Sequence, residues 1–342
     1  MRIHHARPFS RRRFLGGMTL AGTAGLLGLH VRRAAAEPLP ETTRLRIADV
    51  GRGICTAPQY VAEELLRGEG FTDLQYLRKT TFEECLRAMA TGEAEMLITF
   101  VSSLLKRVDA GAPIVMVAGS HVGCFELFGT DRVRTIRDLK GKTVAVPELG
   151  SSPDYLFLSV ILLQVGLDPS RDMQWVEHPA AEAIRLLVEG KVDAFLGFPP
   201  SPQELRAQKI GHVLLNSTTD RPWSQYFCCM VAANRDFVHQ HPVATKRAVR
   251  AFLKSADICA LEPEQTTRLL VAKGYAARYD YALQALRDLP YAGWHEYSAE
   301  DTVRFYALRL HEAGLVKSSP QKLLAQGTDW RFLNELKKEL KG

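Results

Sequence analysis

The sequence predicts an α/β protein with two lobes, each a mostly parallel β-sheet flanked by helices. Short apolar segments rich in β-branched residues alternate with segments of helical pattern from residue 45 to residue 232, and this alternation requires crossovers between parallel strands. From Pro242 onward the pattern is helical throughout, so the C-terminal third offers no strands of its own. Its helices must therefore pack on a sheet formed by the preceding segments.

The alternation occurs in two series. The first predicts strands at 45–50, 74–77, 96–100 and 114–118, with helices at 59–67, 82–89 and 102–109. The second predicts strands at 143–146, 173–176, 194–197, 212–215 and 226–232, with helices at 154–164 and 180–189. The C-terminal helices are expected at 243–261, 264–273, 279–286, 299–313 and 330–340.

Two crossings between the lobes are expected, one near 119–128 and a return near 226–232. Lobe 1 would then comprise 41–122 and 233–342, and lobe 2 would comprise 123–232. Two crossings form a hinge, and the carboxyl ends of the parallel strands, where ligands bind in such sheets, would face each other across a cleft.

The corner at residues 147–154 is the first candidate for a ligand contact. The strand 143–146 stops at Pro147, the chain bends at Gly150, and a helix begins at Ser151-Ser152-Pro153. Free backbone N–H groups at a helix start attract anionic or carbonyl oxygens. An ordinary capped crossover helix explains the same residues equally well.

The basic charge of the chain is concentrated at its start. Residues 1–36 contain seven arginines and no acidic residue, whereas the whole chain has a net charge of +6, so the remainder carries −1 and is not a basic protein. Ser10-Arg11-Arg12-Arg13-Phe14 opens a short, glycine-rich apolar run that ends in Ala34-Ala35-Ala36. This stretch resembles a twin-arginine export signal cut after Ala36. We therefore expect a periplasmic protein with no membrane span of its own.

Six cysteines are present, and their spacing predicts buried thiols. They are Cys55, Cys85, Cys124, Cys228, Cys229 and Cys259. They contain no C-x-x-C pair and no histidine at zinc-finger spacing, so the sequence predicts neither a metal site nor a cofactor. Vicinal Cys228 and Cys229 would point to opposite faces of a strand, which disfavours a disulfide between them.

Three segments of the sequence resemble segments of a known protein family. Residues 138–147 read DLKGKTVAVP, residues 88–95 read AMATGEAE and residues 187–194 read LVEGKVDA. They are similar to segments of periplasmic substrate-binding proteins of the nitrate, sulfonate, taurine and thiamine-precursor class (SsuA/THI5-like, NMT1-like), with Glu95 where the family usually has Asp. The resemblance implies the type II periplasmic-binding-protein fold, a small-molecule ligand, and the permease and ATPase of an ABC importer as partners. It implies a monomer that is peripheral to the membrane and binds no nucleic acid.

The resemblance also implies which residues face the ligand. Carried over by position, they are Arg52, Cys55, Thr56, Ala57, Thr99, His121, Ser151, Ser152, Phe198, Pro199, Trp223, Gln225 and Tyr226. Hydroxyls and N–H groups would hold a polar end of the ligand, with Arg52 or His121 as counter-charge, while aromatic rings cover an apolar face. Core packing for Trp223 and a solvated loop position for Arg52 are equally open.

Two functions are compatible with these features. The first is an exported solute-binding protein that captures a small organic molecule, acidic or aromatic, for import. The second is an enzyme on the same fold, either a desulfinase-like enzyme with Cys55 as nucleophile or a thiamine-pyrimidine activity. The cysteine-rich motif of the pyrimidine synthase is absent, and export favours capture, so we expect a binding protein without catalytic residues.

Overall fold

The computed structural model describes residues 37–51 and 53–340. The predicted signal peptide, 1–36, and the predicted ligand residue Arg52 lie outside these ranges. The described residues from Pro38 onward form one compact unit. Among the described residues, no helix combines the length and the apolar character that crossing a bilayer requires.

The structure contains two five-stranded sheets, both of mixed direction. The first has the order β2-β1-β3-β10-β4, and the second has the order β7-β6-β8-β5-β9. The strands of the first are β1 (Arg44–Asp49), β2 (Asp73–Arg78), β3 (Met96–Phe100), β4 (Ile114–Val122) and β10 (Phe227–Asn234). Those of the second are β5 (Glu126–Gly129), β6 (Thr143–Val146), β7 (Gln174–Glu177), β8 (Ala194–Gly197) and β9 (His212–Asn216).

One strand in each sheet runs against its neighbours. Strand β10 pairs antiparallel with β3 and β4, and β5 pairs antiparallel with β8 and β9, while β1 and β6 pair in parallel with their neighbours. The two antiparallel strands, β5 and β10, are the first strands after the two crossings of the chain. The fold class predicted from the sequence is confirmed, with the antiparallel strands as a refinement.

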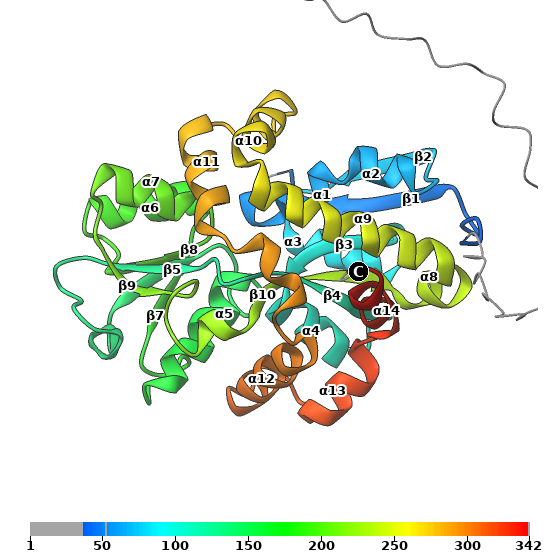
Figure 1. The fold of residues 1–342 in the computed structure, drawn as a ribbon. Helices are drawn as coiled ribbons and strands as arrows, with labels where there is room; N and C mark the ends of the chain where they lie inside the picture. Colours follow the sequence, from blue (N-terminus) through cyan, green and yellow to red (C-terminus); the bar gives the residue numbers. More distant parts are fainter. Residues whose placement is uncertain (1–36, 52, 341–342) are drawn as a thin grey trace, which may run out of the picture. The chain divides into compact units, whose positions relative to one another are not determined.

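Helices cover both faces of the first sheet (Figure 1). Those before the crossing are α1 (Ala57–Val61), α2 (Glu63–Gly68), α3 (Phe82–Ala90) and α4 (Val101–Asp109). Those after the return are α8 (Arg235–Gln240), α9 (Pro242–Leu261), α10 (Pro263–Ala272), α11 (Tyr279–Asp288), α12 (Ala299–Glu312), α13 (Pro320–Gly327) and α14 (Arg331–Glu339). Helix α9 packs along α1, and α12 and α13 pack against α4 on the other face. The C-terminal helices therefore complete the first sheet, as the sequence pattern requires.

The second sheet is flanked by α5 (Pro153–Gln164), α6 (Ala180–Val188) and α7 (Ser201–Gln208). Short 3₁₀ turns are η1 (Ile54–Thr56), η2 (Ile136–Leu139), η3 (Trp223–Gln225) and η4 (Tyr291–His295). The predicted helix 59–67 is divided between α1 and α2, and α7, α8 and α13 were not predicted. Helix α5 has apolar residues on all sides because it is buried almost along its whole length.

The lobe boundaries drawn from the sequence stay a prediction. Strand β10 lies wholly in the first sheet, however, so the part of the second lobe assigned to 227–232 pairs with β3 and β4. Antiparallel pairing with β3 on one side and β4 on the other places this return strand inside the first sheet rather than in the second.

Candidate binding site at the junction of the two sheets

The two sheets are joined where the chain leaves β4 for β5. The crossing runs through Gly123, Cys124 and Phe125, and the backbone N–H groups of Cys124 and Phe125 donate to Ser217 Oγ at 3.0 and 2.8 Å. Gly123 has a φ of +53°, and a Cβ at this position would lie 2.4 Å from the Ser217 carbonyl oxygen. The crossing is therefore fixed against the end of β9 and requires glycine.

Segments at the carboxyl ends of strands from both sheets meet at this junction. Phe198 follows β8, and its ring centroid lies 5.1 Å from that of Phe100 and 5.8 Å from that of Phe82, which belong to the first sheet and its helix α3. Lys106 of α4 donates to the carbonyl oxygen of Gly150, in the corner before α5. The sequence-based expectation that these segments face each other is consistent with these contacts.

Three hydroxyl groups at these segments are buried without a partner. Thr99 lies near the end of β3, Ser103 in the first turn of α4, and Ser151 just before α5. Their oxygens form no hydrogen bond within residues 37–51 and 53–340. A buried polar group without a partner costs roughly 1–3 kcal/mol, so these hydroxyls are suited to a polar ligand that would satisfy them.

Other predicted ligand residues have structural roles. The Ser152 hydroxyl caps α5 by accepting from Tyr155 N at 3.3 Å, and the Thr56 hydroxyl donates to the Gly53 carbonyl at 3.0 Å. Ala57 begins α1 and is buried, and Pro199 is buried before a cis bond to Pro200. Ser152 therefore supports the alternative of an ordinary capped helix, whereas the hydroxyl of its neighbour Ser151 is available to bind a ligand.

The three residues predicted before the return strand pack against α12 or face solvent. The ring of Trp223 is buried, with edge-to-face contacts to Phe157 at 5.1 Å and Phe305 at 5.7 Å between centroids. Tyr226 stacks on Phe305 at 4.0 Å, and Gln225 is exposed. The structure favours the core-packing alternative for Trp223, because protein rings occupy its surroundings.

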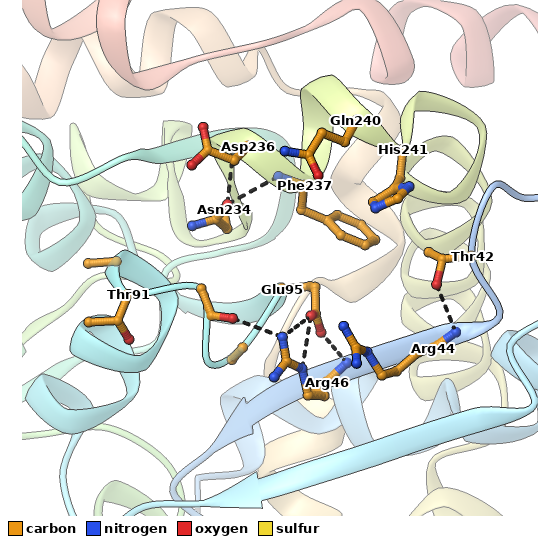
Figure 2. Close-up of a pocket in the computed structure, with 13 residues that line it drawn as sticks. Thr42, Arg44, Arg46, Thr91, Glu95, Asn234, Asp236, Phe237, Gln240 and His241 are labelled. Carbon is orange, nitrogen blue, oxygen red and sulfur yellow. Dashed lines mark hydrogen bonds and ion pairs between the residues drawn. The ribbon is translucent and has the colours of Figure 1, made fainter.

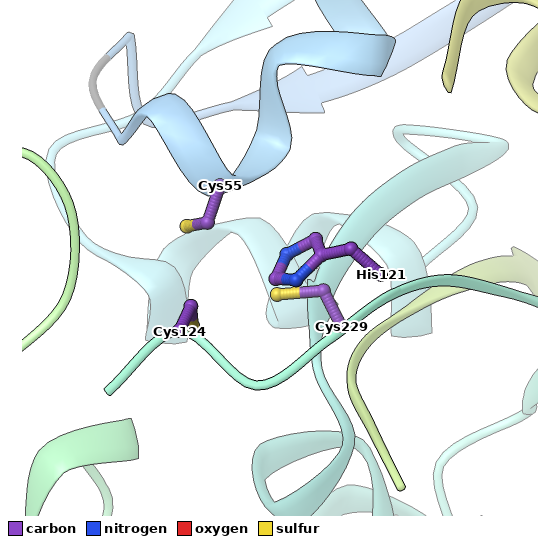
Figure 3. A group of neighbouring side chains, drawn as sticks. All are labelled: Cys55, His121, Cys124 and Cys229. Atoms are coloured by element: carbon purple, nitrogen blue, oxygen red, sulfur yellow. The ribbon is translucent and has the colours of Figure 1, made fainter. Parts of the chain in front are cut away.

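Cys55 and His121 belong to a cluster of buried thiols and imidazole. One ligand atom from each of Cys55, His121, Cys124 and Cys229 lies within 4.8 Å of all the others (Figure 3). His121 and Cys229 are directly paired between β4 and β10, and all six cysteines of the chain are unbridged and buried. The sequence-based prediction that the thiols are buried is confirmed, and three of the six belong to this cluster.

The electrostatics of this cluster follow from its burial and its short contacts. Burial lowers the pKa of His121, but the neighbouring Cys229 and Cys55 thiols outweigh it and raise that pKa to about 10. A hydrogen bond with Cys124 lowers the pKa of Cys55, while the contact with Cys229 and burial prevail and raise it to about 11. Cys55 is therefore a protonated thiol rather than an activated thiolate at neutral pH.

A separate cavity of about 260 Å³ opens at the other end of the first sheet's strands, away from the junction (Figure 2). It lies beside the amino ends of β1 and β3, and its lining includes Arg46. The Nε and Nη2 groups of Arg46 both donate to Glu95 Oε1, Nε at 2.9 Å. Because ligands of α/β sheets bind at the carboxyl ends of strands, this cavity is not the candidate site. The Arg46–Glu95 ion pair links β1 to the residue that precedes β3, and its role is therefore structural.

Sequence reasoning missed Ser103, Cys124 and Cys229 as site residues. Ser103 follows a predicted strand end by three residues, and Cys124 follows His121 by three, which are the available signals. Cys229 could not be assigned from spacing, because it reaches the cluster only through the antiparallel pairing of β10 with β4.

The two sheets and their connection have the fold of the periplasmic binding proteins. The nitrate-binding protein NrtA of Synechocystis superposes with a TM-score of 0.73 and 13% identity, covering 89% of this chain and 90% of that chain. The alkanesulfonate-binding protein SsuA of Xanthomonas axonopodis pv. citri, solved bound to MOPS, gives 0.66 and 17%, covering 86% and 100%. At such identities the likeness shows the shared fold.

Among protein families, residues 126–274 match the NMT1-like family. The resemblance predicted from the sequence is thereby confirmed. The nitrate import ATP-binding protein NrtC of Synechocystis is 21% identical over 223 residues, and the bicarbonate-binding protein CmpA of Synechococcus elongatus is 26% identical over 94 residues. These matches cover 59% and 28% of this chain, but only 33% and 20% of the two relatives.

Proposed function

We propose that this protein is an exported solute-binding protein that holds a small organic molecule between its two sheets for an ABC importer. The observation that carries the proposal is the set of buried hydroxyls of Thr99, Ser103 and Ser151, which have no partner among the described residues and belong to segments at the junction where Phe198 contacts Phe100. Hydroxyls that lack a protein partner can bind carboxylate, sulfonate or carbonyl oxygens of a ligand. The aromatic group suits a planar or apolar remainder.

The proposed location and transport partners follow from the proteins that this chain resembles. Relatives are named for nitrate, bicarbonate and alkanesulfonate binding, and one is the ATP-binding protein of a nitrate importer. We infer a periplasmic monomer, exported by the twin-arginine signal expected at 1–36, which delivers its solute to a membrane permease with an attached ATPase. Closure of the two lobes around the solute would create the surface that the permease recognises.

The enzymatic alternative centred on Cys55 finds less support. A nucleophilic cysteine needs a thiolate and access to its substrate. Cys55 is fully buried, and its pKa is raised to about 11 by its contact with Cys229 and by burial, which together outweigh a hydrogen bond with Cys124. Both features favour an inert thiol and hence binding without turnover.

A thermal-unfolding screen tests the proposal. Nitrate, bicarbonate, short alkanesulfonates and aromatic carboxylates, each with its uncharged amide or alcohol where one exists, would be added to the purified protein. At a concentration 100 times its Kd, a ligand that binds only the folded state stabilises by about 2.7 kcal/mol, and it should be recovered unchanged. Turnover that is lost in Cys55→Ser, or no stabilisation by any class of acid, would contradict the proposal.

A matched pair of variants tests the location of the site. Thr99 and Thr130 both carry a buried hydroxyl with no partner among the described residues, but Thr130 follows β5 at the edge away from the junction. Thr99→Val should weaken binding of the best acid by about 5- to 15-fold, the equivalent of one hydrogen bond, with no loss of stability. Thr130→Val should leave the affinity unchanged. Equal affinities for both variants and the parent would exclude Thr99 from the site.

A further inference from the structure

The cluster of Cys55, His121, Cys124 and Cys229 is gathered from three separate parts of the chain. Cys55 lies in η1 after β1, His121 near the end of β4 with Cys124 on the crossing, and Cys229 in β10. Figure 3 shows the three cysteine side chains around the imidazole of His121. At most 3% of any of the four residues is exposed. Within the described residues, it is the one group of three or more histidine, cysteine or acidic side chains close enough to share a metal ion.

The imidazole is oriented as in known metal sites. His121 Nδ1 lies 2.9 Å from the carbonyl oxygen of Gly123, and it can donate its proton there. Nε2 is buried and has no partner in the described part of the chain. Histidine ligands of metals usually donate their second ring N–H to a backbone carbonyl or a carboxylate in this way, which fixes the tautomer and the ring orientation.

From these contacts we propose that Cys55, Cys124, Cys229 and His121 form a four-coordinate site for a thiophilic metal ion of the zinc type. Three sulfurs and one imidazole nitrogen are a closed tetrahedral set, which has no open position for substrate and is typical of a structural site. Bond lengths of about 2.3 Å to sulfur and 2.0–2.1 Å to nitrogen place tetrahedral ligand atoms about 3.5–3.8 Å apart. The separations of up to 4.8 Å need only a small contraction to reach this geometry.

Binding proceeds with a defined proton balance. Zn²⁺ binds three thiolates and one neutral imidazole. In the metal-free cluster the contacts with Cys229 and Cys55 keep His121 protonated, and the pKa of Cys229 lies below its usual value, so the protons displaced are those of Cys55, Cys124 and His121. Three protons are released, and no redox partner is needed. The bound ion would connect η1, the crossing after β4, and β10. It would thus brace the first sheet where the chain passes to the second. The site depends on no solute, so its test is independent of the proposed function.

Formation of a disulfide between Cys124 and Cys228 would compete with metal binding. Cys124 Sγ lies 2.8 Å from Cys228 Sγ, and a β-bulge around Cys229 in the pairing of β10 with β4 allows both vicinal cysteines to approach Cys124. In an oxidising compartment Cys124 and Cys228 could form a disulfide, which would remove Cys124 from the metal. The four-ligand set favours the metal because a disulfide would leave His121 Nε2 without a partner.

Metal titration of the reduced full-length protein tests the site. One equivalent of Zn²⁺ should bind with release of three protons, raise the melting temperature and protect three thiols from alkylation. Co²⁺ should give the spectrum of a tetrahedral thiolate complex. Cys229→Ser and His121→Gln should each weaken the apparent affinity at least about 100-fold, since even loss of an outer-shell partner costs 10- to 100-fold.

Cys259→Ser is the matched control, because Cys259 is equally buried but lies outside the cluster. It should retain stoichiometric binding. If Cys229→Ser does not fold, His121→Gln and the thiol-protection pattern of the parent protein decide the question. Absence of stoichiometric Zn²⁺ or Co²⁺ binding would overturn the proposal. So would unchanged affinity in both ligand variants, or a Cys124–Cys228 disulfide found by peptide mapping in the protein as exported.

Discussion

Gly123 is the residue on which the connection of the two sheets depends. Its φ is positive, and a Cβ added to it would lie only 2.4 Å from Ser217 O, so a side chain would collide with backbone atoms. Gly166, after α5, also has a positive φ but nothing within 4 Å of its Cβ position. Gly166→Ala should cost about 1 kcal/mol, the strain of the left-handed conformation alone. Gly123→Ala should cost about 2 kcal/mol more, because backbone must move.

Urea unfolding of the two glycine variants and the parent measures this difference. The transitions are compared by their midpoints at constant slope. Similar losses in the two variants would show that the crossing can shift and that its position is not fixed by the contact with Ser217.

Sequence reasoning could name candidate-site residues where they lie at the end of a strand or the start of a helix. Thr99 and Ser151 were predicted to face the ligand because they end a strand or begin a helix at the ligand-facing edge, and neither buried hydroxyl has a partner in the part of the chain that the structure describes. Trp223 shows the limit, because only the fold reveals that Phe157 and Phe305 surround its ring. The thiol cluster lay beyond sequence reasoning, since no local spacing connects Cys55 with Cys229.

Elements were predicted best where the local signals agreed. The strands at 143–146 and 194–197 have the predicted bounds because β-branched or aromatic residues lie between clear turn residues. Helix α7 was missed because its first turn lies in a proline-rich stretch that indicates a loop. Pro202 occupies a first-turn position, where proline lacks no needed hydrogen bond, so the same residues begin a helix.

Helix α9 receives its N-terminal cap from a distant residue. The Glu41 carboxylate accepts from Val243 N at 2.9 Å and Ala244 N at 2.8 Å. Burial raises the pKa of Glu41, and the two backbone donors outweigh it, so the pKa lies below its usual value. The ionised form is therefore favoured by folding, and its contribution is complete above the unfolded pKa and is lost as pH falls through the folded pKa.

Glu41→Gln should accordingly destabilise the protein at pH 7 by at most about 1 kcal/mol, because the side chain is exposed to solvent screening. The difference from the parent should shrink as pH falls below the unfolded pKa of about 4.3 and vanish once the pH is below the lowered pKa of the folded state. Unfolding measured across this pH range checks the prediction. A constant difference at all pH values would mean that charge plays no part in the cap.

At the scale of the whole molecule, the two antiparallel strands explain how one chain builds two similar sheets. Each crossing ends in a strand that runs against its neighbours, β5 in the second sheet and β10 in the first. The sequence predicted two series and two crossings, but not the direction of these strands, which local patterns do not encode. A further link between the sheets is Arg206 of α7, which forms ion pairs with Glu126 of β5 and Asp288 of α11.

Hydrogen exchange with and without the best ligand of the acid panel tests most directly that the solute is held between the sheets. Bound ligand should slow exchange in peptides from both sides of the junction, covering 97–103 and 150–156, while peptides around Arg46 and His241 at the opposite cavity stay unchanged. Protection confined to one sheet, or to that opposite cavity, would contradict a solute site between the two sheets.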